Sequence, residues 1–373
     1  MTARPPFRAD HVGSLLRPAS LKQARKKHFE EHSVSADELR AVEDTEIRKA
    51  IAMQEEVGLP VVTDGELRRS WWHYDFMGML NGLDIETQEG GGLKFKGLTT
   101  KPQVIVLKDR VSFPQDHPML AHFKFVAENT KVTPKISIPG PSACHYRLMD
   151  KNNHVREYQE DLGAYFADLT QTYKDAVKAF YDVGCRYLQM DDIFYAYLCD
   201  ETIRQEWRDR GIDPDWLISE YSTMMRNAVA GRPEDMVIGM HMCRGNNQST
   251  WVAEGGYDPA AEAVFSTGID VFFMEYDSDR AGGLEPLRLL PKGKQRVMPG
   301  FITTKTPELE SLDHLRRLFD EASKYADLDQ MGIAPQCGFS STEEGNKVTE
   351  DDQRRKLELV VKTAEAIWGS TTA

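Results

Sequence analysis

The sequence predicts an α/β fold of the (β/α)8 class, a TIM barrel. Eight short apolar runs end in polar residues or glycine, and nearly all of them are followed by a longer amphipathic stretch. Eight such strand–helix units predict a closed barrel of parallel strands. A doubly wound open sheet is the alternative, but no G-x-G-x-x-G follows the first predicted strand, which disfavours a dinucleotide-binding sheet.

The N-terminal part of the sequence contains the first two predicted strands and a helix between them. Residues 7–16 form the first predicted strand, and residues 59–64 form the second. Between them, residues 35–57 have the apolar periodicity of an amphipathic helix. Ser35 and Glu38 have the spacing of a capping box, which fixes the start of this helix.

An irregular segment, residues 70–131, follows the second predicted strand. It contains the triplet Gly90-Gly91-Gly92 and two runs with extended character, 93–95 and 104–107. Two extended runs beside a glycine-rich stretch are typical of a β-hairpin. We therefore expect one barrel domain over residues 1–373, with a hairpin-containing insertion within it.

Strands and helices alternate regularly through the rest of the chain. The remaining predicted strands are 135–138, 185–190, 236–242, 271–274, 296–302 and 331–335. The remaining predicted helices are 159–183, a stretch within 213–230, 258–266, 284–290, 306–325 and 350–368. Two of these helix starts, Asp258-Pro259 and Thr306-Pro307, combine an N-cap residue with a proline in the first turn.

Charge and cysteine content exclude several classes of protein. The net charge is −13 and no long basic run is present, so neither nucleic acid nor an anionic membrane surface is an expected partner. No apolar stretch approaches the ~20 residues that span a bilayer, and the polar N-terminus is not a signal peptide. The five cysteines are too few and odd in number for a disulfide framework. A cytoplasmic protein is expected.

Polar residues follow the apolar core of most predicted strands. In a barrel the active site forms at the carboxyl ends of the strands, so these residues are the candidates for chemistry. They are Ser14, Asp64-Gly65-Glu66, Asp191-Asp192, His241-Met242-Cys243, Glu275, Thr303-Thr304-Lys305 and Cys337-Gly338.

The fifth predicted strand indicates a metal site. Residues two apart on a strand project to the same face, so His241 and Cys243 project together. Strand 6 adds Glu275 and strand 8 adds Cys337. One nitrogen, two sulfurs and one oxygen suit a zinc ion (Zn2+) better than magnesium or calcium. The competing interpretation is that His-x-Cys on an apolar strand only packs in the core.

Such a site predicts a thiol as substrate. Neutral histidine, two thiolates and one carboxylate carry −3 against the +2 of zinc, so the weakest ligand is exchangeable. A substrate thiol that replaces the carboxylate of Glu275 would lose its proton at neutral pH, because zinc lowers the pKa of a bound group. The thiolate would then attack an electrophilic carbon.

Seven motifs in the same order make the sequence resemble the catalytic domain of cobalamin-independent methionine synthase. The resemblance covers nearly the whole chain. The motifs are H-V-G-S-L-L-R-P at 11–18, V-T-D-G-E at 62–66, L-Q-M-D-D at 188–192, H-M-C at 241–243, F-M-E-Y at 273–276, P-G-F-I-T-T-K-T-P at 299–307 and A-P-Q-C-G-F at 334–339.

The resemblance implies a (β/α)8 barrel that uses zinc to activate homocysteine, whose sulfur takes a methyl group from a methyltetrahydrofolate. It implies zinc ligation by His241, Cys243, Glu275 and Cys337. It further implies that Ser14, Glu66 and Asp191 bind the amino and carboxyl groups of the amino acid. Carboxylates that hold an ammonium and hydroxyl or backbone donors that hold a carboxylate are consistent with that role.

The sequence departs from the family pattern in three ways. The full-length enzyme has a second, N-terminal barrel, for which this chain has no room. The family has a tryptophan for the pterin ring after strand 3, where this chain reads P-G-P-S-A-C-H-Y-R at 139–147; His145 and Tyr146 are the candidate replacements. The family has an aspartate and a catalytic histidine after strand 7, where this chain has Thr303 and Lys305.

Because of these departures, the acceptor half of the reaction is better supported than the donor half. Among short relatives of this family, a corrinoid carrier protein is another methyl donor, and one group opens epoxides with coenzyme M, a thiol sulfonate. Lys305, Arg17 or Arg69 would favour a sulfonate, whereas Glu66 and Asp191 favour an ammonium and hence homocysteine.

Two further classes remain open. A non-catalytic zinc- or thiol-binding barrel would have a closed site without exchangeable ligand. A decarboxylase of the uroporphyrinogen type would grip substrate carboxylates with Arg17, Arg68 and Arg69, but it would leave the histidine and cysteine motifs unexplained.

Overall fold

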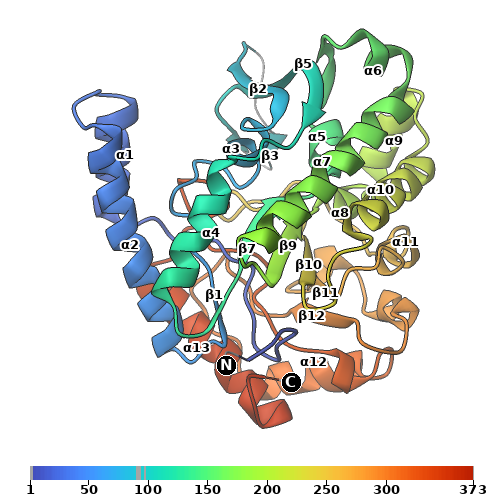
Figure 1. The fold of residues 1–373 in the computed structure, drawn as a ribbon. Helices are drawn as coiled ribbons and strands as arrows, with labels where there is room; N and C mark the ends of the chain where they lie inside the picture. The colour runs from blue at the N-terminus through green and yellow to red at the C-terminus, as the bar shows by residue number, and fades with distance from the viewer. Residues whose placement is uncertain (1–2, 90–93, 96–97, 373) are drawn as a thin grey trace.

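A parallel five-stranded sheet forms the centre of the computed structural model, which describes residues 3–89, 94–95 and 98–372 (Figure 1). The strands of this sheet are β7 (Ile136–Pro139), β9 (Tyr187–Asp191), β10 (Val237–Met242), β11 (Val271–Glu275) and β12 (Arg296–Gly300). They pair in the order β12-β11-β10-β9-β7, and every pair is parallel. Sheet and surrounding helices together make an α/β fold, as predicted.

Further parallel contacts extend this order at both ends. β1 (Val61–Val62) pairs with β6 (Thr133–Pro134), which directly precedes β7. At the other end, single bridges join Val297 to Met331 and Ile333 to Ala9, all in parallel orientation. The predicted first and eighth strands are therefore extended segments held by bridges, and closure of the sheet into a barrel stays a prediction.

The central strands are buried on both faces. All five residues of β9, of β11 and of β12 are buried, which is the pattern expected of parallel strands covered by helices on their outer face. Long helices supply that cover, among them α7 (Leu162–Asp182), α10 (Pro214–Val229) and α13 (Glu350–Trp368).

Helix boundaries follow the capping residues. The capping box of Ser35 and Glu38 opens α2 (Ala36–Glu56), as predicted. Two predicted starts are wrong. Residues 258–260 form a turn, so α11 (Ala261–Phe265) begins later. α12 (Leu312–Ala322) begins after Ser311, whose side chain accepts the hydrogen bond of His314 N–H and so caps the helix there.

Several elements were not anticipated by periodicity. They are α1 (Ala19–Phe29), α3 (Tyr74–Met77), α4 (Pro118–Asn129), α5 (Ser142–Tyr146), β8 (Leu148–Asn153), α6 (Arg156–Glu160), α8 (Phe194–Tyr197), α9 (Glu201–Asp209) and the 3-10 turns η1 (Asp279–Ala281) and η3 (Leu328–Gln330). The predicted short helix at 284–290 is the 3-10 turn η2 (Glu285–Leu289). Among the helices in the described ranges, none is both long enough and apolar enough to cross a membrane.

The segment 70–131 contains antiparallel strands. β2 (Asn81–Thr87) pairs antiparallel with β5 (Gln103–Ser112), and β3 (Lys94–Phe95) pairs antiparallel with β4 (Leu98–Thr99). The glycine triplet and Leu93 lie outside the described residues. β5 also pairs with β8, which gives a three-stranded sheet at one end of the molecule (Figure 1). That the segment is an insertion stays a prediction.

Candidate metal and substrate site

The carboxyl ends of neighbouring parallel strands bring the predicted site residues together. Asp191 ends β9 and Glu275 ends β11, while His241 and Cys243 lie at the end of β10. Cys337 follows the bridge between Pro335 and Ile302. Because these strands are parallel and adjacent, their polar ends share one edge of the sheet.

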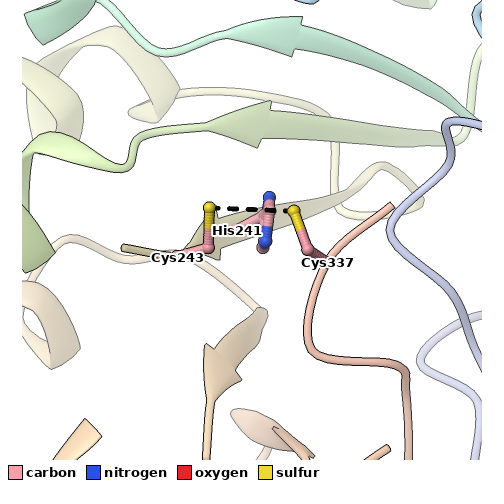
Figure 2. Close-up of side chains that lie close together, drawn as sticks. All are labelled: His241, Cys243 and Cys337. Carbon is pink, nitrogen blue, oxygen red and sulfur yellow. Dashed lines mark hydrogen bonds between the residues drawn. The ribbon is translucent and has the colours of Figure 1, made fainter. Parts of the chain in front are cut away.

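Three of the four predicted ligands form one buried cluster. The donor atoms of His241, Cys243 and Cys337 all lie within 4.8 Å of one another, and Figure 2 shows the three side chains converging. The two sulfur atoms are 3.7 Å apart. Two sulfurs bound to one tetrahedral zinc at about 2.3 Å each would be about 3.8 Å apart. The buried Nε2 of His241 has no hydrogen-bond partner among the described residues, so the residues fit a zinc ion.

Asp191 orients the histidine of this cluster. Its Oδ1 is 3.4 Å from His241 Nδ1 and accepts a hydrogen bond of 2.7 Å from Gln189 Nε2. His241 and Asp191 are paired residues of β10 and β9, so the strand register itself makes this contact. A carboxylate on Nδ1 directs Nε2 toward a metal. The sequence predicted only a substrate role for Asp191 and missed this one.

Glu275 lies outside the three-residue cluster. Its Oε1 accepts a hydrogen bond of 2.8 Å from Arg280 Nε, and its Oε2 accepts one of 3.1 Å from the Arg244 backbone N–H. The carboxylate is fully buried, and the nearby cations Lys305, Arg280 and Arg244 outweigh that burial, so the pKa of Glu275 is lowered. Glu275 is therefore an ionised group beside the cluster, with both oxygens bound elsewhere.

Close contacts within the cluster shift the pKa values of all three of its members. Burial disfavours the charged His241, but Cys337 and Asp191 outweigh it and raise the pKa of His241 to about 10. The contact between the two cysteine sulfurs lowers the pKa of Cys337 well below its ordinary value and raises the pKa of Cys243. The contacts therefore favour the protonated forms of His241 and Cys243 and the ionised form of Cys337.

The predicted substrate residues line the same cavity as the cluster. One cavity is bordered by Ser14, Glu66, Asp191, His241, Cys243 and Cys337, which are all the predicted site residues except Glu275. Ser14 is positioned by close backbone contact, since a Cβ at Gly338 would lie 1.8 Å from its Oγ. Gly338 is thus the residue that lets the loop after Cys337 approach Ser14.

Glu66 presents a free carboxylate oxygen. Its Oε1 accepts a hydrogen bond of 2.8 Å from Ser137 Oγ, whereas its buried Oε2 has no partner among the described residues. Burial raises the pKa of Glu66 to about 7, and Asp191 adds to the rise while Arg69 opposes it. A buried acceptor of this kind suits a cationic ligand group.

Arg147, the residue after α5, lines the cavity, whereas the sequence suggested His145 and Tyr146 as the candidates. Arg147 lines the cavity together with Trp71, Trp72 and Phe95, whereas His145 and Tyr146 do not border it. His145 Nδ1 is instead 2.7 Å from the Tyr221 hydroxyl, and Tyr146 stacks on Phe194 at 4.3 Å. Sequence reasoning missed Arg147, because the direction of its side chain depends on the end of α5.

The other basic side chains that the sequence offered as candidates already make hydrogen bonds or ion pairs within the protein. Arg17 donates to the backbone carbonyls of Leu15, Glu66, Arg69 and Ser340, and Arg69 donates to that of Ser137. Arg68 pairs with Glu43 and Asp44. Lys305 Nζ is 3.1 Å from Asn246 Oδ1 and 3.3 Å from the Gly245 carbonyl. None of these four side chains borders the cavity, which disfavours the arginine-gripping decarboxylase.

Comparisons with known proteins identify the family of the chain. Residues 7–366 match the model of the catalytic domain of the cobalamin-independent synthase family. The chain is 43% identical to the uncharacterised protein YxjG of Bacillus subtilis, over 98% of this chain and 96% of that protein. The solved structure of a candidate vitamin-B12-independent methionine synthase from Listeria monocytogenes is 34% identical, with a TM-score of 0.78 over 98% of this chain and 99% of that chain.

A longer relative has a stated activity. The 5-methyltetrahydropteroyltriglutamate–homocysteine methyltransferase of Thermotoga maritima is 22% identical over 90% of this chain, which spans only 42% of that enzyme. The α/β fold with its parallel sheet matches methionine synthase catalytic domains, as the likeness to the Listeria structure shows. The chain belongs to the cobalamin-independent methionine synthase family, whose catalytic domain it matches over nearly its whole length.

Proposed function

We propose that this enzyme is a zinc-dependent S-methyltransferase that methylates homocysteine to methionine. The observation that supports it most is the convergence of His241, Cys243 and Cys337 beside two buried carboxylates, Glu66 and Asp191, in one cavity. We further propose that the eight predicted strands close into a (β/α)8 barrel forming a single domain, with residues 70–131 inserted after the second strand.

Each group then has a defined task. His241, Cys243 and Cys337 would hold zinc, with Asp191 fixing the imidazole ring. Zinc bound there would lower the pKa of the substrate thiol. Glu66 and Asp191 would hold the ammonium of the amino acid and Ser14 its carboxylate, so that the sulfur is aimed at the donor.

The reaction is a displacement at carbon. The homocysteine thiolate forms a bond to the methyl carbon, and the bond from that carbon to the donor breaks with its electron pair on the donor. Glu275 would be the fourth ligand that the substrate sulfur replaces, which requires its carboxylate to turn away from Arg280.

The donor is proposed to be a methyltetrahydrofolate, since the family includes an enzyme named for that donor. The comparisons give no support to a separate methyl-carrier protein. Metal analysis followed by calorimetry with homocysteine tests the proposal as a whole. One zinc per chain and homocysteine binding with release of about one proton support it, and zinc without thiol binding would favour a closed, non-catalytic metal site.

Zinc binding is expected to release protons near pH 7.5. Zinc binds the deprotonated forms, and the pKa values of His241 and Cys243 are both raised, so these two residues retain protons that zinc must displace. Calorimetric titration in two buffers with different ionisation enthalpies measures the number. Release of no protons would contradict the proposed state of the cluster.

Methionine, the expected product, should bind more tightly as the pH rises from 6 to 7.5. Glu66 is mostly protonated at pH 6 because burial raises its pKa to about 7, and only the ionised form attracts the ammonium. We expect a fivefold to tenfold gain in affinity, about the change in the ionised fraction. Methionine has no thiol proton, so zinc-linked ionisation does not interfere. Glu66→Gln should bind weakly at every pH; a Glu66→Gln protein with an unchanged pH profile would refute this role.

An epoxyalkane–coenzyme M transferase is the second candidate, and Arg147 is the observation that favours it, because a cation in the cavity suits a sulfonate. Glu66 and Asp191 in the same cavity argue for an amino acid instead. Competition between the two thiols for the zinc-loaded protein decides. Binding of coenzyme M without binding of homocysteine would replace the first proposal with the second.

A further inference from the structure

Arg147 is the one arginine or lysine among the described residues that line the cavity. It follows α5, which is connected to the carboxyl end of β7 through Pro139 and Pro141. Its side chain therefore lies at the same edge of the sheet as Cys243 and Cys337. No role in holding the metal explains it, because an arginine is not a zinc ligand.

An aromatic wall fixes the position of Arg147. The guanidinium carbon is 5.0 Å from the ring centre of Phe194 and 5.8 Å from those of Tyr146 and Tyr197. Tyr146 and Phe194 stack on each other at 4.3 Å, so the wall is itself a packed unit. A guanidinium held against aromatic rings keeps its N–H groups available for an anion.

Two hydrogen-bond donors beside this cavity, the Nε of Arg147 and the hydroxyl of Tyr197, have no acceptor among the described residues. Within the described ranges, no carboxylate lies within 4.0 Å of Arg147 to form an ion pair, and its Nε is buried without a hydrogen-bond partner. Tyr197 is 1% exposed and lines the same cavity; its hydroxyl interacts with the Arg147 side chain but has no acceptor for its own proton. Buried donors without acceptors are costly, and an anionic ligand group would satisfy both.

The cavity therefore has two unlike ends. The carboxylates of Glu66 and Asp191 suit a cationic group, whereas Arg147 and Tyr197 suit an anionic one. We propose that Arg147 and Tyr197 form an anion-binding subsite that takes a carboxylate, sulfonate or phosphate group of a substrate. The link to a substrate rests on the proposed function, because the thiol and its electrophile must meet in this cavity.

That anionic group has two possible sources, and they make different demands. If it is the carboxylate of homocysteine, Arg147 holds the thiol by the end opposite to its sulfur. If it belongs to the methyl donor, Arg147 selects a donor that carries a negative charge. In both cases the guanidinium supplies charge-assisted hydrogen bonds, each worth about 1.5–3 kcal/mol, or roughly a 10- to 100-fold change in affinity.

Calorimetry on the zinc-loaded protein tests the subsite with inorganic phosphate as the probe, in the absence of thiol. We expect Arg147→Gln to weaken phosphate binding by 10-fold or more, Arg147→Lys by less, and Tyr197→Phe by a few-fold. Arg186→Gln is the matched control, because Arg186 lies 3.7 Å from the Tyr181 ring and also packs on an aromatic side chain, but outside the cavity. Its phosphate affinity should be that of the wild type.

Two thiols identify the source of the anion. Homocysteine and 3-aminopropane-1-thiol differ only by the carboxylate. If Arg147→Gln abolishes the wild-type preference for homocysteine, the subsite holds the acceptor. If the preference stays and only phosphate binding falls, the subsite serves the methyl donor.

An Arg147→Gln protein that binds phosphate and both thiols as the wild type does would overturn the subsite, and so would a wild type that neither binds phosphate nor prefers homocysteine. If no thiol binds to any variant, the proposed function fails, but the phosphate titration still tests whether Arg147 binds an anion.

Discussion

Replacing Cys243 or Cys337 by serine is expected to remove zinc from the protein and to abolish methyl transfer. A serine hydroxyl stays protonated at neutral pH and is a poor zinc ligand, and the two sulfurs are 3.7 Å apart in a cluster of only three potential ligands. Changing a residue that merely supports a metal ligand costs about 10- to 100-fold in metal affinity. Loss of a ligand itself should cost at least about 100-fold.

The chain offers a matched control for this experiment. Cys199 is also buried, but its sulfur is not part of the cluster. It donates a hydrogen bond of 3.2 Å to the Tyr195 carbonyl oxygen, a contact that a serine hydroxyl reproduces. Cys199→Ser should keep one zinc per chain and its activity. Zinc is measured by metal analysis after gel filtration, and turnover is measured with homocysteine. A Cys337→Ser enzyme that loses zinc but turns over normally would show that the metal has no part in the reaction.

The sequence predicted best those helices and strands whose ends are determined by residues close to them in the sequence. The capping box opens α2 and buried apolar runs mark β10 and β11, because both features act over a few residues. The start of α12 was misplaced because Thr306-Pro307 has the composition of an N-terminus, whereas the residue that caps the helix is Ser311, whose side chain accepts a hydrogen bond from His314 N–H.

The site was predictable to the extent that strand geometry determines it. The two-residue period of a strand places His241 and Cys243 on one face, and a parallel order brings Cys337 to the same edge. The support of His241 by Asp191 depends on the pairing register of β9 and β10, and the place of Arg147 depends on how α5 ends. Neither register nor helix exit can be read from residue types alone.

A buried ion pair inside the sheet predicts the largest effect on stability. Lys135 Nζ is 2.7 Å from Asp10 Oδ1 and 3.1 Å from Gln189 Oε1, and both members of the pair are 0% exposed. The Tyr187 hydroxyl donates to Asp10 Oδ2 at 2.6 Å. Burial lowers the pKa of Lys135 despite the opposing effect of Asp10, which reflects the cost of keeping a cation away from water.

Lys135→Met is therefore expected to lower the free energy of unfolding by about 3–5 kcal/mol, because it leaves the carboxylate of Asp10 buried without a counter-charge. Lys135 connects three segments of the structure. Asp10 lies in the N-terminal extended segment, Lys135 itself lies between β6 and β7, and Gln189 lies in β9. Methionine fills a similar volume, so a packing defect contributes little.

Denaturant unfolding, followed by circular dichroism and by tryptophan fluorescence, measures the effect where the two transitions coincide. Lys178→Met removes a pair with Asp182 whose side chains are 74% and 55% exposed, and it should change stability by less than about 0.5 kcal/mol. The double variant Lys135→Met with Asp10→Asn removes both charges, so it should be less destabilised than the sum of the two single variants. A Lys135→Met protein within about 1 kcal/mol of the wild type would mean that Tyr187 and the backbone satisfy Asp10 without a cation.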